Sequence, residues 1–262
     1  MKNTFKNWFA ALLLAAPMSM AAAAGGHANY EKVDIDLGDQ VSLQRGAQIF
    51  TNYCLSCHSA TGMRFNRLQD IGLTEDEIKK NLMFTTDKVG DVMQAAMTPT
   101  EGKKWFGAAP PDLTLIARSR GADYLYAYLR GFYQDPTRPT GWNNTVFDKV
   151  GMPHPLWEQQ GVKAVELDKD GQPVWEKDEH GNLVPKLYWE STGLHSRRLP
   201  NGKVIEKEYD DYVRDLVNYM VYMGEPAQMQ RKQIGYIVLI FLLAVMLPLA
   251  YFLKKEYWKD VH

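Results

Sequence analysis

The residues with the most distinctive chemistry are the only two cysteines of the chain, Cys54 and Cys57, which are followed directly by His58. The pattern Cys-x-x-Cys-His is typical of covalent haem attachment through two thioether bonds. Two intervening residues allow both sulfur atoms to face one edge of a porphyrin, and the next residue can place its imidazole on the iron. The sequence therefore predicts one c-type haem held by Cys54 and Cys57, with His58 as an axial ligand.

Other interpretations of the two cysteines are less favoured. A thioredoxin-like Cys-x-x-Cys would need a βαβ context, whereas the preceding segment has helical periodicity. A zinc site would need a second pair of ligands, and the chain has no further cysteine. A disulfide between Cys54 and Cys57 is sterically poor for a structural role.

A second axial ligand must come from elsewhere, and Met152 is the preferred candidate. It lies in Gly151-Met152-Pro153-His154-Pro155, where glycine and proline predict an extended loop that could lay a thioether on the iron. A methionine more often packs in a core. His154 is the alternative, because residues two apart in an extended segment point the same way. Weaker candidates lie in polar, turn-like stretches: His27, His180 and His195.

The choice of ligand bears on function. Histidine–methionine ligation raises the reduction potential and closes the iron to substrates, which suits electron transfer. An open sixth position would instead suit peroxidase-like chemistry or gas binding. For an electron carrier no catalytic acid or base is expected.

Helical periodicity occurs in four segments, the first of which leads into the haem motif. Residues 43, 47, 50 and 54 share one helical face, and Thr74–Glu77 is a capping box that begins a second helix. The fourth helix ends at Gly224-Glu225-Pro226. The apolar repeats of the third and fourth helices are Leu125, Tyr128, Leu129 and Phe132, and Val213, Leu216, Val217 and Met220. Between 158 and 208, turn signals at 170–171, 180–182 and 200–202 predict an insertion of β-hairpins and loops.

The two ends of the chain predict export and membrane anchoring. Residues 1–24 contain two lysines, a short apolar core and an alanine run, which are typical of a signal peptide. The 19 uncharged residues of Gly235–Leu253 would span roughly 28 Å as a helix, close to the thickness of a bilayer core. We therefore expect a periplasmic domain over 25–230, a transmembrane anchor over 231–254 and a cytoplasmic tail over 255–262.

The formal net charge of −1 disfavours a general nucleic-acid binder, which needs a basic face. This total conceals an acidic body, because residues 25–230 hold 23 basic against 29 acidic residues, a net charge of about −6. Acidic runs occur at 75–77, 176–179 and 206–211. Such runs are most often solvated faces, and the alternative is a docking surface for a basic partner.

Several further segments occur in an order that resembles the cytochrome c1 family, the haem subunit of the ubiquinol–cytochrome c reductase (bc1) complex. After the haem motif come Ala109–Arg120 (APPDLTLIARSR), Gly121–Tyr124 (GADY), the Gly151-Met152-Pro153 loop, Asp215–Pro226 and the C-terminal apolar segment. Two features differ from the family pattern. Lys104-Trp105-Phe106-Gly107 stands where relatives often have an Asn-Gly-Gly stretch, and the 158–208 region has no cysteine pair.

The resemblance implies a mostly α fold, namely a class I cytochrome c-like haem domain with a loop and β-hairpin insertion and one C-terminal transmembrane helix. It implies His58 and Met152 as axial ligands and Pro111 lying along the haem. Arg120 and Tyr124 would contact a haem propionate, for which a guanidinium is well suited.

The family's partners follow from the same resemblance. They are cytochrome b, a Rieske iron–sulfur protein as electron donor and a cytochrome c as acceptor, in a complex that is usually dimeric. The location would be a bacterial inner membrane. Two alternatives stay open: a free membrane-tethered haem carrier, and a haem enzyme or ligand sensor with an open iron.

Overall fold

Helix α2 (Gln40–Ile49) and a single π-helical turn, η1 (Phe50–Cys54), carry the chain into the haem motif. They are seen in a computed structural model that describes residues 29–259, so the predicted signal peptide and the last three residues of the tail lie outside the described residues. The Asp39 carboxylate caps α2 by accepting from the Ser42 amide at 3.0 Å. The predicted face is confirmed, because residues 43, 47, 50 and 54 are all buried. The π turn is a feature that the apolar spacing did not predict.

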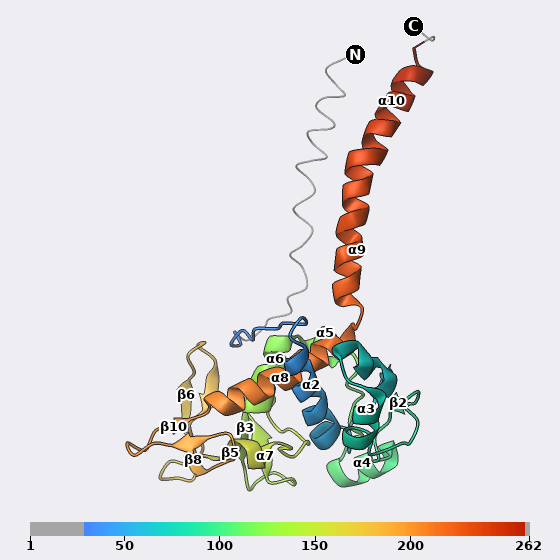
Figure 1. Cartoon of the computed structure of the whole chain (residues 1–262). Coiled ribbons are helices and arrows are strands. Elements are labelled where there is room, and N and C mark those ends of the chain that lie inside the picture. Colours follow the sequence, from blue (N-terminus) through green and yellow to red (C-terminus); the bar gives the residue numbers. More distant parts are fainter. Residues whose placement is uncertain (1–28, 260–262) are drawn as a thin grey trace.

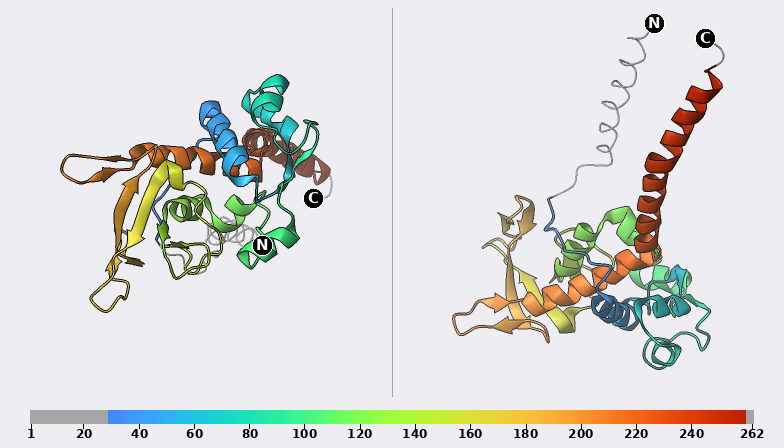
Figure 2. Two further views of the ribbon diagram at one scale, coloured as in Figure 1. Left: turned by 90° about the horizontal axis from the view of Figure 1, so that it is seen from below. Right: turned by 45° about the horizontal axis from the view of Figure 1, so that its top comes forward.

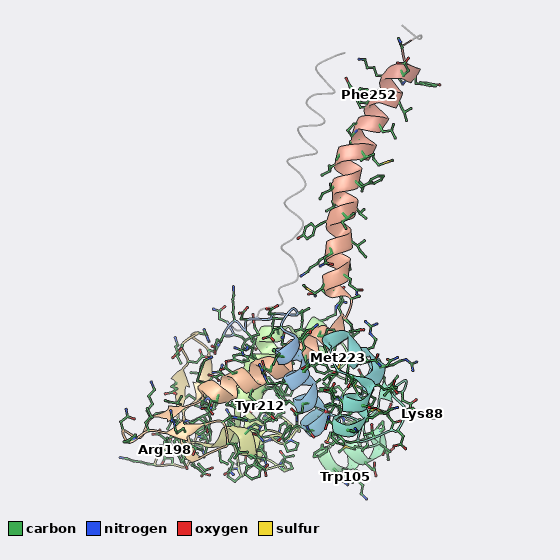
Figure 3. The ribbon with its side chains drawn as sticks, viewed as in Figure 1. Lys88, Trp105, Arg198, Tyr212, Met223 and Phe252 are labelled. Atoms are coloured by element: carbon green, nitrogen blue, oxygen red, sulfur yellow. The ribbon has the colours of Figure 1, made fainter. Side chains whose placement is uncertain are left out.

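Helix α8 (Lys207–Gly224) runs across the body of the protein and packs against α2 (Figure 1). Its predicted apolar face is buried, and the helix ends at the predicted Gly224. Side chains along its length, such as Tyr212 and Met223, can be followed in Figure 3. The two helices cross closely at Gly46, where an added Cβ would lie 2.1 Å from the Asp215 carbonyl oxygen. Glycine at 46 therefore permits this crossing.

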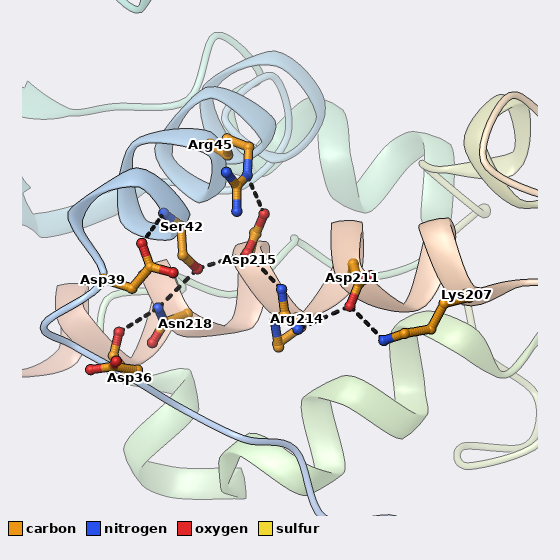
Figure 4. A network of polar contacts seen from close by, with 9 residues as sticks. All are labelled: Asp36, Asp39, Ser42, Arg45, Lys207, Asp211, Arg214, Asp215 and Asn218. Atoms are coloured by element: carbon orange, nitrogen blue, oxygen red, sulfur yellow. Dashed lines mark hydrogen bonds and ion pairs between the residues drawn. The ribbon is translucent and has the colours of Figure 1, made fainter.

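A polar network joins α2 to α8 at the same crossing (Figure 4). The Asp215 carboxylate is only 4% exposed, accepts from the Ser42 hydroxyl at 2.7 Å and forms an ion pair with Arg45 at 2.5 Å. Asn218 donates to Ser42 Oγ at 3.0 Å and to the Asp36 carbonyl at 2.8 Å. The network fixes the position of α2, and hence of the haem motif that follows it.

We expect Asp215→Ala to lower the free energy of unfolding by about 2 kcal/mol, because it leaves the Ser42 hydroxyl and the Arg45 guanidinium without their acceptor. The matched control is Asp211→Ala, one turn earlier on α8. Asp211 pairs with Lys207 and Arg214 at the surface, so its loss should cost less than about 0.5 kcal/mol. Denaturant unfolding in detergent measures both variants. Equal destabilisation by the two would contradict this role of Asp215.

Several short elements follow the haem motif along the chain. They are β1 (Ala60–Arg64), η2 (Phe65–Ile71), α3 (Glu75–Asn81), β2 (Val92–Met93), α4 (Pro99–Phe106), α5 (Ile116–Arg120) and α6 (Ala122–Arg130). The capping box of α3 is confirmed, with Thr74 as its first residue. A second capping box, Thr98 with Glu101, begins α4. We did not predict this helix from the sequence, although its Thr-x-x-Glu pattern is the same one that predicted the start of α3.

A mixed sheet of strand order β4-β3-β5-β8 lies beside the N-terminal end of α8, away from the C-terminal helix (Figure 2). Its strands are β3 (Phe132–Gln134), β4 (Trp142–Asn144), β5 (Gly161–Val165) and β8 (Leu187–Thr192), and α7 (Trp157–Gln160) precedes β5. Phe132 was predicted to continue the third helix, which is wrong. Helix α6 ends at Arg130 with Gly131 as its C-cap, and Phe132 begins β3.

Two hairpins occupy the region in which turns were predicted. The first consists of β6 (Trp175–Lys177) and β7 (Leu183–Pro185), and the second of β9 (Arg197–Arg198) and β10 (Val204–Ile205). The glycines of the predicted turns, Gly171, Gly181 and Gly202, all have positive φ angles near 80°. This is the left-handed conformation that glycine adopts without steric cost.

The C-terminal helix leaves the body as one 30-residue rod, Gln228–Tyr257, long and apolar enough to cross a membrane (Figure 1). It comprises α9 (Gln228–Phe241), the π turn η3 (Leu242–Met246) and α10 (Leu247–Tyr257). The π turn ends two residues before Pro248, which has no backbone N–H to donate and whose ring clashes with the carbonyl four residues earlier in a regular helix. At the base of the rod, Glu225 accepts from Arg231 at 2.5 and 3.1 Å and lies 3.7 Å from Arg118.

Candidate haem site

The haem motif forms one tight turn at the end of η1. The amides of Cys57 and His58 both donate to the Cys54 carbonyl, at 3.1 and 2.8 Å. Both cysteines are free thiols; Cys54 is buried and Cys57 is half-buried. Burial raises the pKa of the Cys54 thiol to about 12. The turn thus presents two unpaired thiols and an imidazole from five consecutive residues, a donor set that fits a c-type haem.

The His58 ring is held by its Nδ1 atom, which lies 2.8 Å from the carbonyl oxygen of Pro111. A carbonyl can only accept, so Nδ1 carries the proton and the lone pair is on Nε2. This arrangement is typical of histidines that bind a metal through Nε2. Burial lowers the pKa of His58, which favours the neutral imidazole needed by a ligand.

The segment Pro110–Thr114 is fastened to the chain that follows the haem motif. The Leu113 amide donates to the Ser59 carbonyl at 2.8 Å. The Asp112 carboxylate accepts from the Thr61 amide at 2.8 Å and from the Thr61 hydroxyl at 2.9 Å. These bonds hold the Pro111 carbonyl against His58, and they give a local structural reason for the Pro-Pro-Asp-Leu sequence.

Helix α4 packs against both this segment and the Met152 loop. An added Cβ on Gly102 would lie 2.4 Å from Pro110 Cδ, and one on Gly151 would lie 3.1 Å from the Phe106 carbonyl oxygen. Both contacts are therefore close approaches of backbone to a neighbour. Gly151, the residue before Met152, and Pro110, the residue before Pro111, thus both lie against α4.

Met152 lies beside a row of aromatic side chains formed by Tyr124, Tyr128 and Phe132. Its sulfur is 3.5 Å from the Tyr128 hydroxyl, which donates to it, and the side chain is half-buried. Four methionines instead pack in the core, which is the commoner role: Met63, Met93, Met220 and Met223.

His154, the alternative ligand, has both ring nitrogens engaged. Nε2 lies 2.9 Å from Gln160 Oε1, and Nδ1 accepts from the Leu156 amide at 3.4 Å. Its ring stacks on Phe132 with centroids 4.7 Å apart and planes 3° apart, and Trp142 meets it edge-on. Burial lowers the pKa of His154 to about 3. This packing favours Met152 over His154 as the residue free to approach an iron.

The remaining predicted residues have different surroundings. The Arg120 guanidinium lies 5.7 Å from the centroid of the Tyr124 ring and makes no ion pair within residues 29–259. Tyr124 packs between Tyr30 and Tyr128. Of the weaker histidine candidates, His195 stacks on Tyr212, while His27 lies outside the described residues.

Two residues that organise the site were not predicted. Tyr128 was placed on a helical face but not beside Met152, and the interaction of Gln160 with His154 had no sequence signal. The spacing of Tyr124, Tyr128 and Phe132, four residues apart, is the pattern that could have indicated an aromatic row.

The chain also matches known proteins over nearly its whole length. The sequence model of the Cytochrome C1 family matches residues 34–205 and 201–261. Cytochrome c1 of Allochromatium vinosum is 45% identical over 97% of this chain and 98% of its own length. A protein of Nitrosomonas europaea named ammonia monooxygenase gamma subunit is 48% identical over 95% of this chain and 96% of its own length. The mitochondrial cytochrome c1 of Schizosaccharomyces pombe is 29% identical over 58% of this chain and 56% of its own length.

These matches and the site agree on one cofactor. The two thiols and the oriented imidazole fit a c-type haem, and cytochrome c1 proteins carry such a haem covalently. With the family match spanning both the haem motif and the C-terminal apolar helix, the chain belongs to the cytochrome c1 family.

Proposed function

We propose that this chain is the haem-bearing electron-transfer subunit of a ubiquinol–cytochrome c reductase. It accepts one electron from a Rieske iron–sulfur protein and passes it to a cytochrome c. The observation that carries this proposal is the His58 imidazole, whose Nδ1 is fixed on the Pro111 carbonyl so that Nε2 is left for iron. A bound haem supplies a one-electron couple; the chain itself contributes no acid or base.

Each of the proposed site residues has a separate role in binding the haem. Cys54 and Cys57 would form the thioether bonds, and His58 and Met152 would be the two ligands of the iron. Pro111 orients His58 through its carbonyl oxygen. With both ligands in place, the iron would have no open position for a substrate, so the chain would act as an electron-transfer subunit and not as an enzyme on its own.

The propionate contacts are proposed from two neighbouring side chains. Arg120 makes no ion pair within the described residues, so its guanidinium is available for a carboxylate. Tyr124 lies under it and offers a hydroxyl. The haem domain would adopt a class I cytochrome c-like arrangement, with the loop and β-hairpin insertion of 158–208 added to it.

The proposed placement in the membrane follows from the two ends. The signal peptide over 1–24 exports residues 25–230 to the periplasm of a bacterial cell. The anchor predicted over 231–254 lies inside the 30-residue apolar helix Gln228–Tyr257. Residues 255–262 then remain in the cytoplasm. The chain would associate with cytochrome b beside this helix, in a dimeric complex.

The acidic body suits a basic electron acceptor, although not every acidic run is free. In the run 206–211, Glu206 pairs with Lys163, Asp210 with Arg130 and Asp211 with Lys207. The runs at 75–77 and 176–179 are more exposed. Long-range attraction of this kind speeds association and weakens as salt rises.

Co-purification tests the assignment of partners. The full chain, isolated in mild detergent from its native membrane, is expected to carry cytochrome b and a Rieske protein with it. A free tethered carrier would be isolated without them. The name of the N. europaea relative suggests a third outcome, association with an ammonia monooxygenase. Isolation of the haem protein without cytochrome b and a Rieske protein would contradict the proposal.

A further inference from the structure

We propose that Tyr128 sets the reduction potential of this site and orients its methionine, by donating a hydrogen bond to the sulfur of Met152. The inference rests on the proposed ligation of iron by Met152. Tyr128 acts here as a positioning residue, because it touches the ligand and acts through it.

The contact has the geometry of a hydroxyl–thioether hydrogen bond. Tyr128 Oη lies 3.5 Å from Met152 Sδ, and a thioether sulfur can only accept. Because the sulfur has two lone pairs, one can bind a metal while the other accepts from the hydroxyl. A sulfur held in this way has a defined direction in which its remaining lone pair points.

The Tyr128 ring is fixed on both sides. It stacks on Tyr124 with centroids 6.0 Å apart and planes at 15°, and it meets Phe132 edge-on at 5.2 Å. Tyr124 and Tyr128 occupy successive turns of α6, and Phe132 begins the strand that follows. Phe132 in turn stacks on His154, two residues beyond Met152. The donor and the loop of the acceptor therefore belong to one packed row of rings.

The backbones of the two partners are tied to one strand, β4. Asn144 Nδ2 donates to the Tyr128 carbonyl at 2.8 Å, while Asn144 Oδ1 accepts from the Val146 amide at 2.8 Å. The neighbouring Asn143 Oδ1 accepts from the Lys149 amide at 2.8 Å. Lys149 has a left-handed φ of 58°, so the turn before the Met152 loop is held in a specific shape. These bonds set the separation of the hydroxyl and the sulfur.

The electronic consequence follows from the direction of donation. A hydrogen bond to the sulfur draws electron density from it and makes the thioether a weaker donor to iron. Ferric iron needs that density more than ferrous iron does, so the bond favours the reduced state. The potential is expected to be higher with the hydroxyl than without it.

Tyr128→Phe in the full-length haem protein tests this inference. The ring packing stays, and only the hydroxyl is lost. We expect a lower midpoint potential, corresponding to roughly a threefold change in the reduction equilibrium, or about 28 mV at 59 mV per decade. The methionine-to-iron charge-transfer band should shift or weaken. Tyr126→Phe is the matched control, since Tyr126 is buried on the same helix but lies against Arg130.

The outcomes separate this inference from the proposed ligation. If the unmodified protein lacks the charge-transfer band, ligation by Met152 fails, whatever Tyr128 does. If the band is present and Tyr128→Phe has the same potential and band as the Tyr126→Phe control, the ligation stands and the role of Tyr128 is wrong. Loss of the band in Tyr128→Phe alone would support the positioning role.

Discussion

Cys54→Ala is expected to reduce covalently bound haem more than tenfold and to prevent stable folding of the haem domain. Cys54 is 7% exposed and belongs to the main hydrophobic core, together with Phe50 and Leu55. A haem attached there becomes part of that core, so the free energy of its binding contributes to folding, as it does for other cofactor-dependent domains. Haem staining on a denaturing gel and the thermal melting of the purified protein measure the two effects.

Cys57→Ala is the comparison for that variant. Cys57 is half-buried and lies outside the core cluster, so its replacement removes one thioether but leaves the core intact. We expect it to retain more haem and to melt at a higher temperature than Cys54→Ala. Normal haem staining of Cys54→Ala would show that Cys54 does not attach haem.

Met152→Leu is expected to leave haem attached and to lower the reduction potential by on the order of 0.1 V, since axial ligands set haem potentials over a range of about 0.8 V. Leucine fills a similar volume but has no lone pair for iron. The methionine-to-iron charge-transfer band should disappear from the spectrum of the oxidised protein. The reduced protein should then bind carbon monoxide, which histidine–methionine ligation excludes.

A second half-buried methionine provides the control for this substitution. Met97 lies beside the haem motif, and its amide donates to the Ser56 carbonyl at 3.1 Å. Met97→Leu should therefore keep both the band and the potential. If the band survives in Met152→Leu, another residue is the ligand. A potential and spectrum of bis-histidine type in the unmodified protein would identify His154 instead.

The sequence predicted best those elements whose signals are local. The face of α2, the capping box of α3, the apolar face of α8 and the turns of the hairpins depend on neighbours a few residues apart. Each of these was confirmed at the level of individual residues. The haem motif is local in the same sense, because its five consecutive residues carry the whole chemical pattern.

What the sequence could not supply arises from contacts between distant segments. Phe132 fits the helical repeat of α6, but pairing of β3 with β4 and β5 overrides that periodicity. The choice between Met152 and His154 could not be made from spacing, because both follow one extended loop. It depends on residues of three other elements that hold the His154 ring in place. Gln160 hydrogen-bonds to it, and Phe132 and Trp142 pack against it.

The short joint between α8 and the membrane helix has a mechanical consequence. Only Glu225–Ala227 separates the two helices; Pro226 has a restricted φ, and Glu225 is shared between Arg118 of the body and Arg231 of the rod. We therefore expect this joint to restrict the angle between the haem domain and the membrane helix more than a long flexible linker would. If the proposed membrane placement holds, a haem at Cys54 and Cys57 would stay at a nearly constant height above the bilayer, and the partner proteins would make the movements that electron delivery requires.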